Sequence, residues 1–164
     1  MENFVKIKPC KKVPTLTVDK KKTNGWLLEL ISDRDGFTKN MRGQVYMTVL
    51  APGIEKGYHI HAGAQYFITC IRGNITSTIY KNRFTKQTIK SGEGDFKTYE
   101  LPLGSAHFMS NKKGKKDAWV LCYRYPAWSP DFEEQLDILP KEIETEKAWR
   151  EITSFVESFK KKNK

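Results

Sequence analysis

Residues 44–73 read QVYMTVLAPGIEKGYHIHAGAQYFITCIRG, and a run of β-branched and aromatic residues lies at each end of this segment. The two runs, Gln44–Leu50 and Gln65–Ile71, are separated by the turn signal Pro52-Gly53 and by further glycines. Short runs of this composition, bounded by Gly and Pro, predict strands rather than helices. The pattern continues on both sides of the segment, with similar runs at Trp26–Ile31, Asn74–Tyr80, Phe96–Leu101 and Ala118–Tyr125.

Turn signals separate these runs at short intervals, at Asp33–Gly36, Gly73-Asn74, Gly92–Asp95 and Pro102–Gly104. Strands at this spacing predict an all-β sandwich or barrel. A parallel βαβ architecture would need helical patterns between the strands, and no such pattern occurs before residue 130. We therefore predict an all-β fold over residues 25–138, preceded by a lysine-rich lead-in over residues 1–24.

The end of the chain, residues 139–164, has a different character. Apolar residues recur there at helical spacing, and Glu and Lys occupy most of the other positions; the apolar set is Trp149, Ile152, Val156 and Phe159, with Phe155 beside it. This pattern predicts an amphipathic helix that begins near Pro140 and ends in a basic tail. Its apolar stripe could pack on the barrel or on a second subunit, and we expect it to pack on the barrel.

Composition excludes several classes of protein. No run approaches the roughly 18 apolar residues that a membrane-spanning helix needs, and no apolar stretch follows the acidic N-terminus as a signal peptide would require. The three cysteines, Cys10, Cys70 and Cys122, are widely spaced and form no CxxC pair. A disulfide framework is therefore excluded, and a cytoplasmic location is expected.

The formal net charge is +10, which raises the question of nucleic acid. Most of the excess lies in the first 22 residues, in the segment 112–116 and in the tail 160–164. No zinc-finger, helix-turn-helix or RNP-like pattern accompanies it. We interpret these lysines as a solvated or weakly anion-attracting surface and expect no specific nucleic acid partner.

All three histidines of the chain fit one constellation. His59 and His61 form an H-x-H pair, and on an extended strand residues i and i+2 face the same side. Gln65 keeps that parity if the chain stays extended, and a Pro-x-Gly turn leads into His107. Three imidazoles and one amide oxygen would hold a single divalent metal ion (Zn, Mn, Fe or Ni) with room for a ligand. The alternative is that the histidines are unrelated core or surface residues.

The two segments resemble the two motifs of the cupin superfamily. The first motif is matched by Gly57, His59, His61, Gln65 and Gly73, with glutamine where glutamate is usual. The second motif, P-x-G-x-x-H-x-x-x-N, is matched by Pro102, Gly104, His107 and Asn111. This resemblance implies a cupin double-stranded β-helix, or jelly-roll barrel. A glutamine ligand would leave the ion its full charge, which favours binding of an enolate or carboxylate over dioxygenase chemistry.

A narrower resemblance is to the dTDP-4-dehydrorhamnose 3,5-epimerase-like cupins and to the cupin domains of sugar-nucleotide enzymes in capsule biosynthesis. It is carried by Trp26–Leu30, Lys56–His59, Gln65–Phe67, Leu101–His107 and Tyr123–Pro130. It implies an enzyme of polysaccharide biosynthesis that epimerises or isomerises a nucleotide-linked keto sugar by proton transfer next to the carbonyl. Barrel edges and the helix stripe favour a homodimer.

The resemblance also implies roles for single residues. His59 matches the base histidine and Tyr123 is the nearest match to the proton-donating tyrosine, with Tyr125 on the same strand face. Lys56 stands where an arginine of that family contacts the sugar or phosphates, and Tyr66 stands where that family has a basic lysine. Further candidates to bind a diphosphate are Arg83 and Arg124, although Arg124 faces away from both tyrosines on a regular strand. The aspartate that orients the base histidine in that family has no recognisable counterpart.

Two further functions stay open. A metal cupin could act on a free sugar acid or small acid as a lyase, isomerase or dioxygenase, or the barrel could bind a sugar without turnover. His59 also cannot be a metal ligand and a free general base at once.

Overall fold

The computed structural model describes residues 4–16, 23–30, 37, 43–126 and 131–162. The predicted turn Asp33–Gly36 and the segment 127–130 lie outside the described residues. In chain order the strands are β1 Ile7–Pro9, β2 Lys11–Leu16, β3 Thr23–Glu29, β4 Gln44–Leu50, β5 Glu55–His61, β6 Gln65–Arg72, β7 Asn74–Asn82, β8 Thr85–Gly92, β9 Lys97–Leu101, β10 Ala106–Ser110, β11 Ala118–Tyr125 and β12 Gln135–Asp137. One helix, α1 Glu146–Lys162, follows them.

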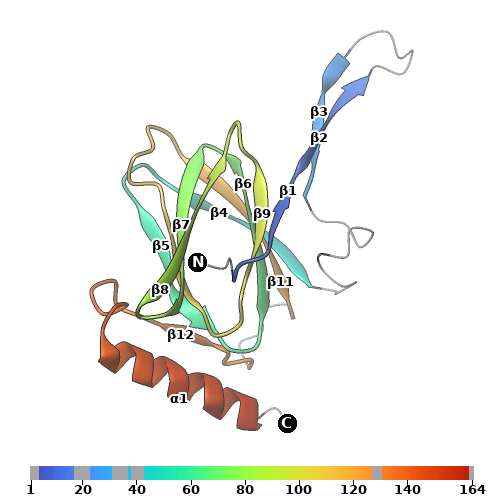
Figure 1. Ribbon diagram of the computed structural model, residues 1–164. Coiled ribbons are helices and arrows are strands. Elements are labelled where there is room, and N and C mark those ends of the chain that lie inside the picture. The colour runs from blue at the N-terminus through green and yellow to red at the C-terminus, as the bar shows by residue number, and fades with distance from the viewer. Residues whose placement is uncertain (1–3, 17–22, 31–36, 38–42, 127–130, 163–164) are drawn as a thin grey trace.

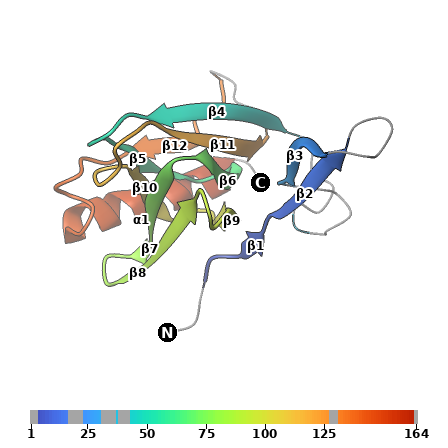
Figure 2. The ribbon, with the colours of Figure 1, turned by 90° about the horizontal axis from the view of Figure 1, so that it is seen from above.

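Two antiparallel five-stranded sheets face each other (Figures 1 and 2). The first sheet has the order β1-β9-β6-β11-β4 and the second has the order β12-β5-β10-β7-β8. The strands β2 and β3 form a separate hairpin that extends away from both sheets. The predicted all-β fold with a C-terminal helix is confirmed. The lead-in over residues 1–24 contributes β1, because its backbone pairs with the edge strand β9 through the register Ile7↔Tyr99.

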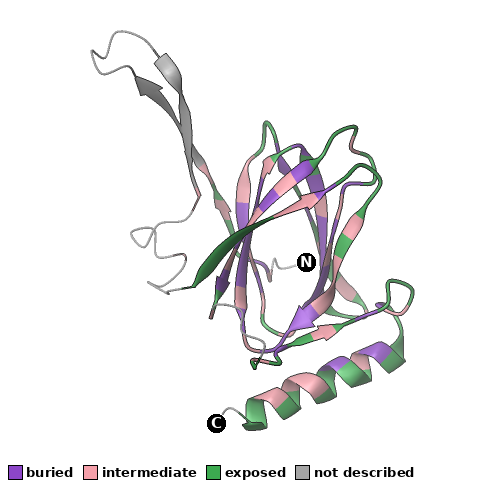
Figure 3. Cartoon of the chain, turned by 180° about the vertical axis from the view of Figure 1, so that it is seen from behind, coloured by how far each residue is buried: buried purple, intermediate pink, exposed green. Residues whose placement is uncertain are grey.

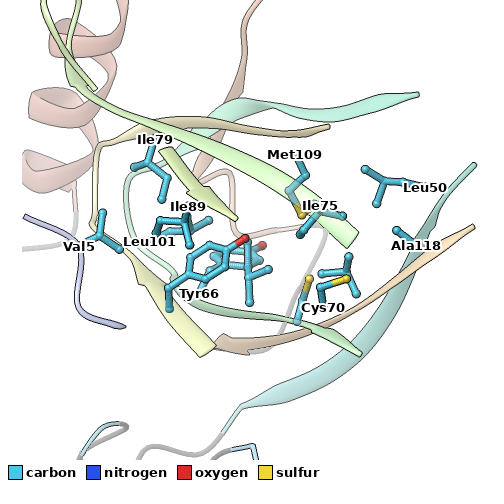
Figure 4. Close-up of a cluster of buried hydrophobic side chains, with 14 of the residues drawn as sticks. Val5, Leu50, Tyr66, Cys70, Ile75, Ile79, Ile89, Leu101, Met109 and Ala118 are labelled. Atoms are coloured by element: carbon cyan, nitrogen blue, oxygen red, sulfur yellow. The ribbon is translucent and has the colours of Figure 1, made fainter. Parts of the chain in front are cut away.

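The main core fills the space between the sheets. It takes alternate residues of each strand, as a pleated strand requires, and includes Ile68, Ile79, Tyr99 and Val120. Figure 4 shows part of this core, with Tyr66 and Cys70 pointing into it from β6. Figure 3 shows the same alternation, because buried residues alternate with more exposed ones along the strands. The inner faces of the two sheets therefore form one enclosed space.

A second apolar cluster lies on the outer face of the second sheet, where α1 covers it. Ile60, Tyr80 and Ala106 of the sheet pack there with Ile152 and other apolar residues of the helix. The helix begins at Glu146 rather than near Pro140, since residues 140–144 form turns. The Thr145 hydroxyl then caps the helix by accepting a hydrogen bond from the Ala148 amide at 3.2 Å. Among the described residues, no helix has the length and apolar composition needed to cross a bilayer.

Candidate functional site

The three histidines meet on the inner face of the second sheet. His59 and His61 lie on β5, and the register His107↔His59 brings the third imidazole opposite them from β10. Ring centroids are 4.7 Å apart for His59 and His61, and 4.8 Å apart for His59 and His107. His61 and His107 are buried, whereas the side chain of His59 is 25% exposed. His59 is therefore the member of the cluster that a ligand can reach.

A buried carboxylate fixes the orientation of His61. Glu134, which directly precedes β12, has Oε1 at 3.0 Å from Nδ1 of His61. Its Oε2 accepts a hydrogen bond from the Ala64 amide at 3.2 Å. With Nδ1 donating to the carboxylate, Nε2 of His61 keeps its lone pair; this nitrogen is buried and has no hydrogen-bond partner among the described residues. Nδ1 of His107 is buried in the same way.

Arg124 completes this buried group. Its Nη2 donates to Oε1 of Glu134 at 2.7 Å, and both side chains are almost fully buried. Burial raises the pKa of Glu134, but the His61 hydrogen bond and the Arg124 charge outweigh it and hold the pKa below its usual value. The ring of Tyr66 stacks on His61 at 3.9 Å, and the Arg124 guanidinium lies 5.5 Å from the centre of that ring.

Burial also keeps His59 and His107 neutral. It lowers the pKa of His59 to about 4, with a further contribution from His61, although Asp137 and Glu134 act in the opposite direction. The pKa of His107 lies well below its usual value for the same main reason. Asp137 of β12 pairs in register with His59, and its Oδ1 lies 3.7 Å from Nδ1 of His59. His59 and His107 therefore offer uncharged nitrogens that can accept a proton or bind a cation.

A tyrosine that the sequence analysis did not select lies on the opposite wall. Tyr46 of β4 is the register partner of the buried Cys122, so it faces the inside of the barrel. It shares hydrogen bonds with Tyr66 and Cys122, and burial raises its pKa. Its exposed fraction is 36%, which leaves the ring open to a ligand. Because Tyr66 stacks on His61, the Tyr46 hydroxyl is linked to the histidine cluster.

The structure does not bring Gln65, Tyr123 and Tyr125 to the cluster. Tyr66 faces inward, so its neighbour Gln65 faces outward, where Nε2 donates to Oε1 of Glu100 at 3.2 Å. Tyr123 lies on the same outer face against Phe67, with ring centroids 5.8 Å apart. Tyr125 is the register partner of Gln65 and is 39% exposed. The sequence left open whether Arg124 or the two tyrosines face the barrel, and Arg124 does.

The two other predicted ligand-binding residues lie in different places. Lys56 precedes the H-x-H pair on β5, and its Nζ donates to the carbonyl of Val49 at 2.5 Å, which ties β5 of one sheet to the edge strand β4 of the other. Arg83 lies in the turn between β7 and β8, where its guanidinium stacks over Phe84 and is 3.5 Å from Glu146 of α1. Arg83 is therefore part of the contact between barrel and helix.

The three imidazoles can be tested against a divalent metal ion. Their coordinating nitrogens lie within 4.8 Å of one another. Two nitrogens bound to one Zn²⁺ at about 2.1 Å each can be at most about 4.2 Å apart. A small rotation of the partly exposed His59 ring would bring its nitrogen within this limit. The donor set therefore fits a divalent ion, with three protein ligands in place of the four expected from the sequence.

Comparison with known proteins supports the fold. No family model and no curated protein matches the sequence. Among solved structures, a dTDP sugar isomerase from Desulfovibrio desulfuricans G20 superposes with a TM-score of 0.72 at 14% identity, covering 88% of this chain and 91% of that one. A dTDP-4-dehydrorhamnose 3,5-epimerase from Sulfolobus tokodaii gives a TM-score of 0.66 at 18% identity, with coverage of 87% and 82%.

The chain has the fold of these sugar-nucleotide cupins. The predicted cupin jelly roll is thus confirmed at the level of fold. The capsular polysaccharide assembling protein CapF from Staphylococcus aureus also matches, with a TM-score of 0.56 and 19% identity. That match covers 59% of this chain, which spans only 28% of the length of CapF.

Two residues of the site were missed for different reasons. Glu134 has a detectable signal, because Phe132, Glu134 and Ile138 share one strand parity and a charged residue at an apolar position indicates a buried partner. Tyr46 gives a misleading signal. Its neighbours Val45 and Met47 are the more apolar residues, yet they face outward and are 64% and 48% exposed.

Proposed function

We propose that this protein epimerises or isomerises a nucleotide-linked 4-keto sugar by moving a proton at the carbon next to the carbonyl. The observation that carries the proposal is the inner cluster of three imidazoles facing a partly exposed tyrosine, Tyr46, in a sugar-nucleotide cupin fold. One structure of this fold is a 4-keto-6-deoxy sugar epimerase, and another is an epimerase in complex with dTDP-4-keto-L-rhamnose.

Each step can be assigned to a group in the barrel. His59 accepts the proton from the carbon next to the carbonyl, and the electron pair of that C–H bond forms the C=C bond of an enolate. The protonated His59 imidazole, with the Asp137 carboxylate 3.7 Å from its Nδ1, then lies against the negative charge of the enolate. Tyr46 donates a proton to the carbon, which restores the ketone; solvent then returns a proton to the Tyr46 oxygen and removes one from His59. We assign a sugar contact to Tyr66, which stacks on His61, and a phosphate contact to Lys56, which precedes the H-x-H pair on β5.

Wild-type protein is expected to incorporate deuterium from heavy water into a dTDP-4-keto-6-deoxy sugar, as followed by NMR. Tyr46→Phe should slow the transformation by about 100-fold or more, because it removes the proton donor and keeps the ring. Tyr123→Phe is the matched control: its hydroxyl lies on the outer face and its loss should leave the rate unchanged. Exchange that is absent in the wild type, or lost equally in both variants, contradicts the proposal.

A metal-dependent form of the same site is a second candidate, favoured by the unpartnered nitrogens of His61 and His107. His59, His61 and His107 would hold the ion, which would supply Lewis acidity toward the carbonyl oxygen. In that form His59 is occupied as a ligand, so we assign the proton transfer to Tyr46.

Metal content separates the two forms. In the metal-dependent form, protein purified without a polyhistidine tag contains nearly one divalent ion per chain by elemental analysis, and His107→Ala loses it. Gln65→Ala should retain the ion, because Gln65 hydrogen-bonds to Glu100 on the outer face. Wild-type protein that is folded and free of metal rejects this form and leaves His59 as the base.

We further propose a homodimer formed through the outer face of the first sheet. Val45, Met47 and Tyr125 are all exposed on this face, and an apolar sheet face of this kind is suited to a second copy of itself. Val45→Lys with Met47→Lys should convert a dimer to a monomer in light scattering. Phe84→Lys is the control, because Phe84 is 80% exposed on the turn beside α1. A wild-type monomer, or a dimer that survives the double change, contradicts this assignment.

We also propose a biological process and a cellular location for the enzyme. We assign it to polysaccharide biosynthesis, because CapF is named as a capsular polysaccharide assembling protein. We assign it to the cytoplasm on the basis of the three free cysteines.

A further inference from the structure

The hydroxyl of Tyr46 lies beside a buried thiol that the proposed mechanism does not use. Cys122 of β11 is the register partner of Tyr46 on β4, and its side chain is 2% exposed. Cys122 belongs to the main core, so this pair of side chains faces the inside of the barrel. The Tyr46 hydroxyl shares one hydrogen bond with the Cys122 thiol and another with the Tyr66 hydroxyl.

Tyr46 needs such contacts because β4 is an edge strand. Within the described residues, β4 pairs with β11 on one side and with no strand on the other. The Tyr46 ring is 36% exposed, so packing restrains it less than it restrains a core side chain. A group that delivers a proton to one particular carbon has to be held within a fraction of an ångström of its working position. Hydrogen bonds to buried partners supply this restraint.

Cys122 is suited to hold the hydroxyl without taking part in the chemistry. Its register partner on the other side is Ile68 of β6, which is also buried, so the thiol has a fixed place in the core. Burial raises the pKa of the Cys122 thiol to about 12, so the thiol is uncharged at neutral pH. An uncharged thiol forms hydrogen bonds but is a poor nucleophile, because the thiolate is the reactive form.

We propose that Cys122 is a positioning residue, whose thiol holds the Tyr46 hydroxyl in place for proton transfer to carbon. This inference rests on the proposed function with His59 as the base. The enolate of that reaction has two fates: protonation by His59 returns the starting sugar, and protonation by Tyr46 gives the product. In both, the C=C electron pair forms the new C–H bond and the ketone is restored. A displaced Tyr46 ring therefore favours return over product.

The test measures both fates by NMR in heavy water with the full chain and a dTDP-4-keto-6-deoxy sugar. The proton on His59 exchanges with solvent, so return gives deuterium-labelled starting sugar, and the ratio of this sugar to product reports how the enolate divides. Cys122→Ala should raise this ratio by about tenfold, because a displaced donor slows the product branch alone. A partly unfolded variant slows both branches equally, so lower stability does not change the ratio.

Two further variants identify the cause of the change. Cys122→Ser keeps a group that can donate and accept a hydrogen bond, so the ratio should return close to that of the wild type. Cys70→Ala is the matched control, because Cys70 is a buried core thiol of the same sheet (Figure 4), yet its Sγ donates to the carbonyl of Arg72 at 3.3 Å. It removes the same sulfur atom from the core and should leave the ratio unchanged.

The same measurements can overturn the proposal. An unchanged ratio in Cys122→Ala rejects the positioning role, and an equal rise in Cys70→Ala assigns the effect to general loosening of the core. A ratio that stays high in Cys122→Ser rejects the hydrogen bond as the cause. Wild-type protein that forms neither labelled sugar nor product rejects the proposed function itself, and this inference with it.

Discussion

His59→Asn is expected to lower deuterium exchange into a dTDP-4-keto-6-deoxy sugar by a factor of about 100 to 10,000. His59 is the most exposed imidazole of the cluster, and its pKa of about 4 keeps it uncharged at neutral pH. Asparagine preserves much of the size and polarity but cannot take up a proton. The measurement is single-turnover exchange followed by NMR, because it reports proton removal even when later steps are slow.

Two companion measurements make this result specific. Thermal unfolding of His59→Asn should resemble that of the wild type, since the side chain is partly exposed and its neighbour Asp137 is a surface residue. Asp137→Asn should reduce exchange less than His59→Asn does, because the exposed Asp137 carboxylate acts on His59 only through its charge, from 3.7 Å. Exchange in a folded His59→Asn variant at more than half of the wild-type rate would remove His59 from the role of base.

The H-x-H pair was predictable because it lies within one regular strand. The side-chain period of a strand places His59 and His61 on one face without any knowledge of the rest of the chain. The Pro-x-Gly turn before β10 allowed His107 to be placed beside them. The same reasoning placed Gln65 wrongly. Residues 62–64 form a bend between β5 and β6, so the alternation of side-chain faces along β5 does not continue into β6.

Which side chains of β4 and β11 face the barrel interior could not be predicted without knowledge of the tertiary contacts. In β4 the more apolar alternate residues, Val45 and Met47, face outward, so a hydrophobic pattern taken alone points Tyr46 to solvent. In β11 the charged Arg124 faces the barrel and the aromatic Tyr123 faces out. A buried arginine is tolerable only beside a buried acid, and that acid, Glu134, comes from a segment ten residues away in the chain. Sequence periodicity cannot show such a pairing.

Glu134→Ala is expected to destabilise the fold by about 3 to 5 kcal/mol, because it leaves the guanidinium of Arg124 buried without a counter-charge. The carboxylate also accepts hydrogen bonds from His61 and from the Ala64 amide, and both donors would lose their partner. Chemical denaturation at pH 7 measures the change. The control is Glu146→Ala, which removes the partner of Arg83 in an exposed pair and should cost no more than about 1 kcal/mol.

A double variant separates the cost of the unpaired charge from the value of the ion pair. Glu134→Leu combined with Arg124→Met removes both charges from the interior and fills similar volume, so much of the lost stability should return. Activity should not return with it, because His61 would lack the carboxylate that holds its Nδ1 proton and directs Nε2 toward the cluster. A double variant as unstable as Glu134→Ala would mean that the pair itself stabilises the barrel. A stable and fully active double variant would show that the carboxylate has no part in positioning His61.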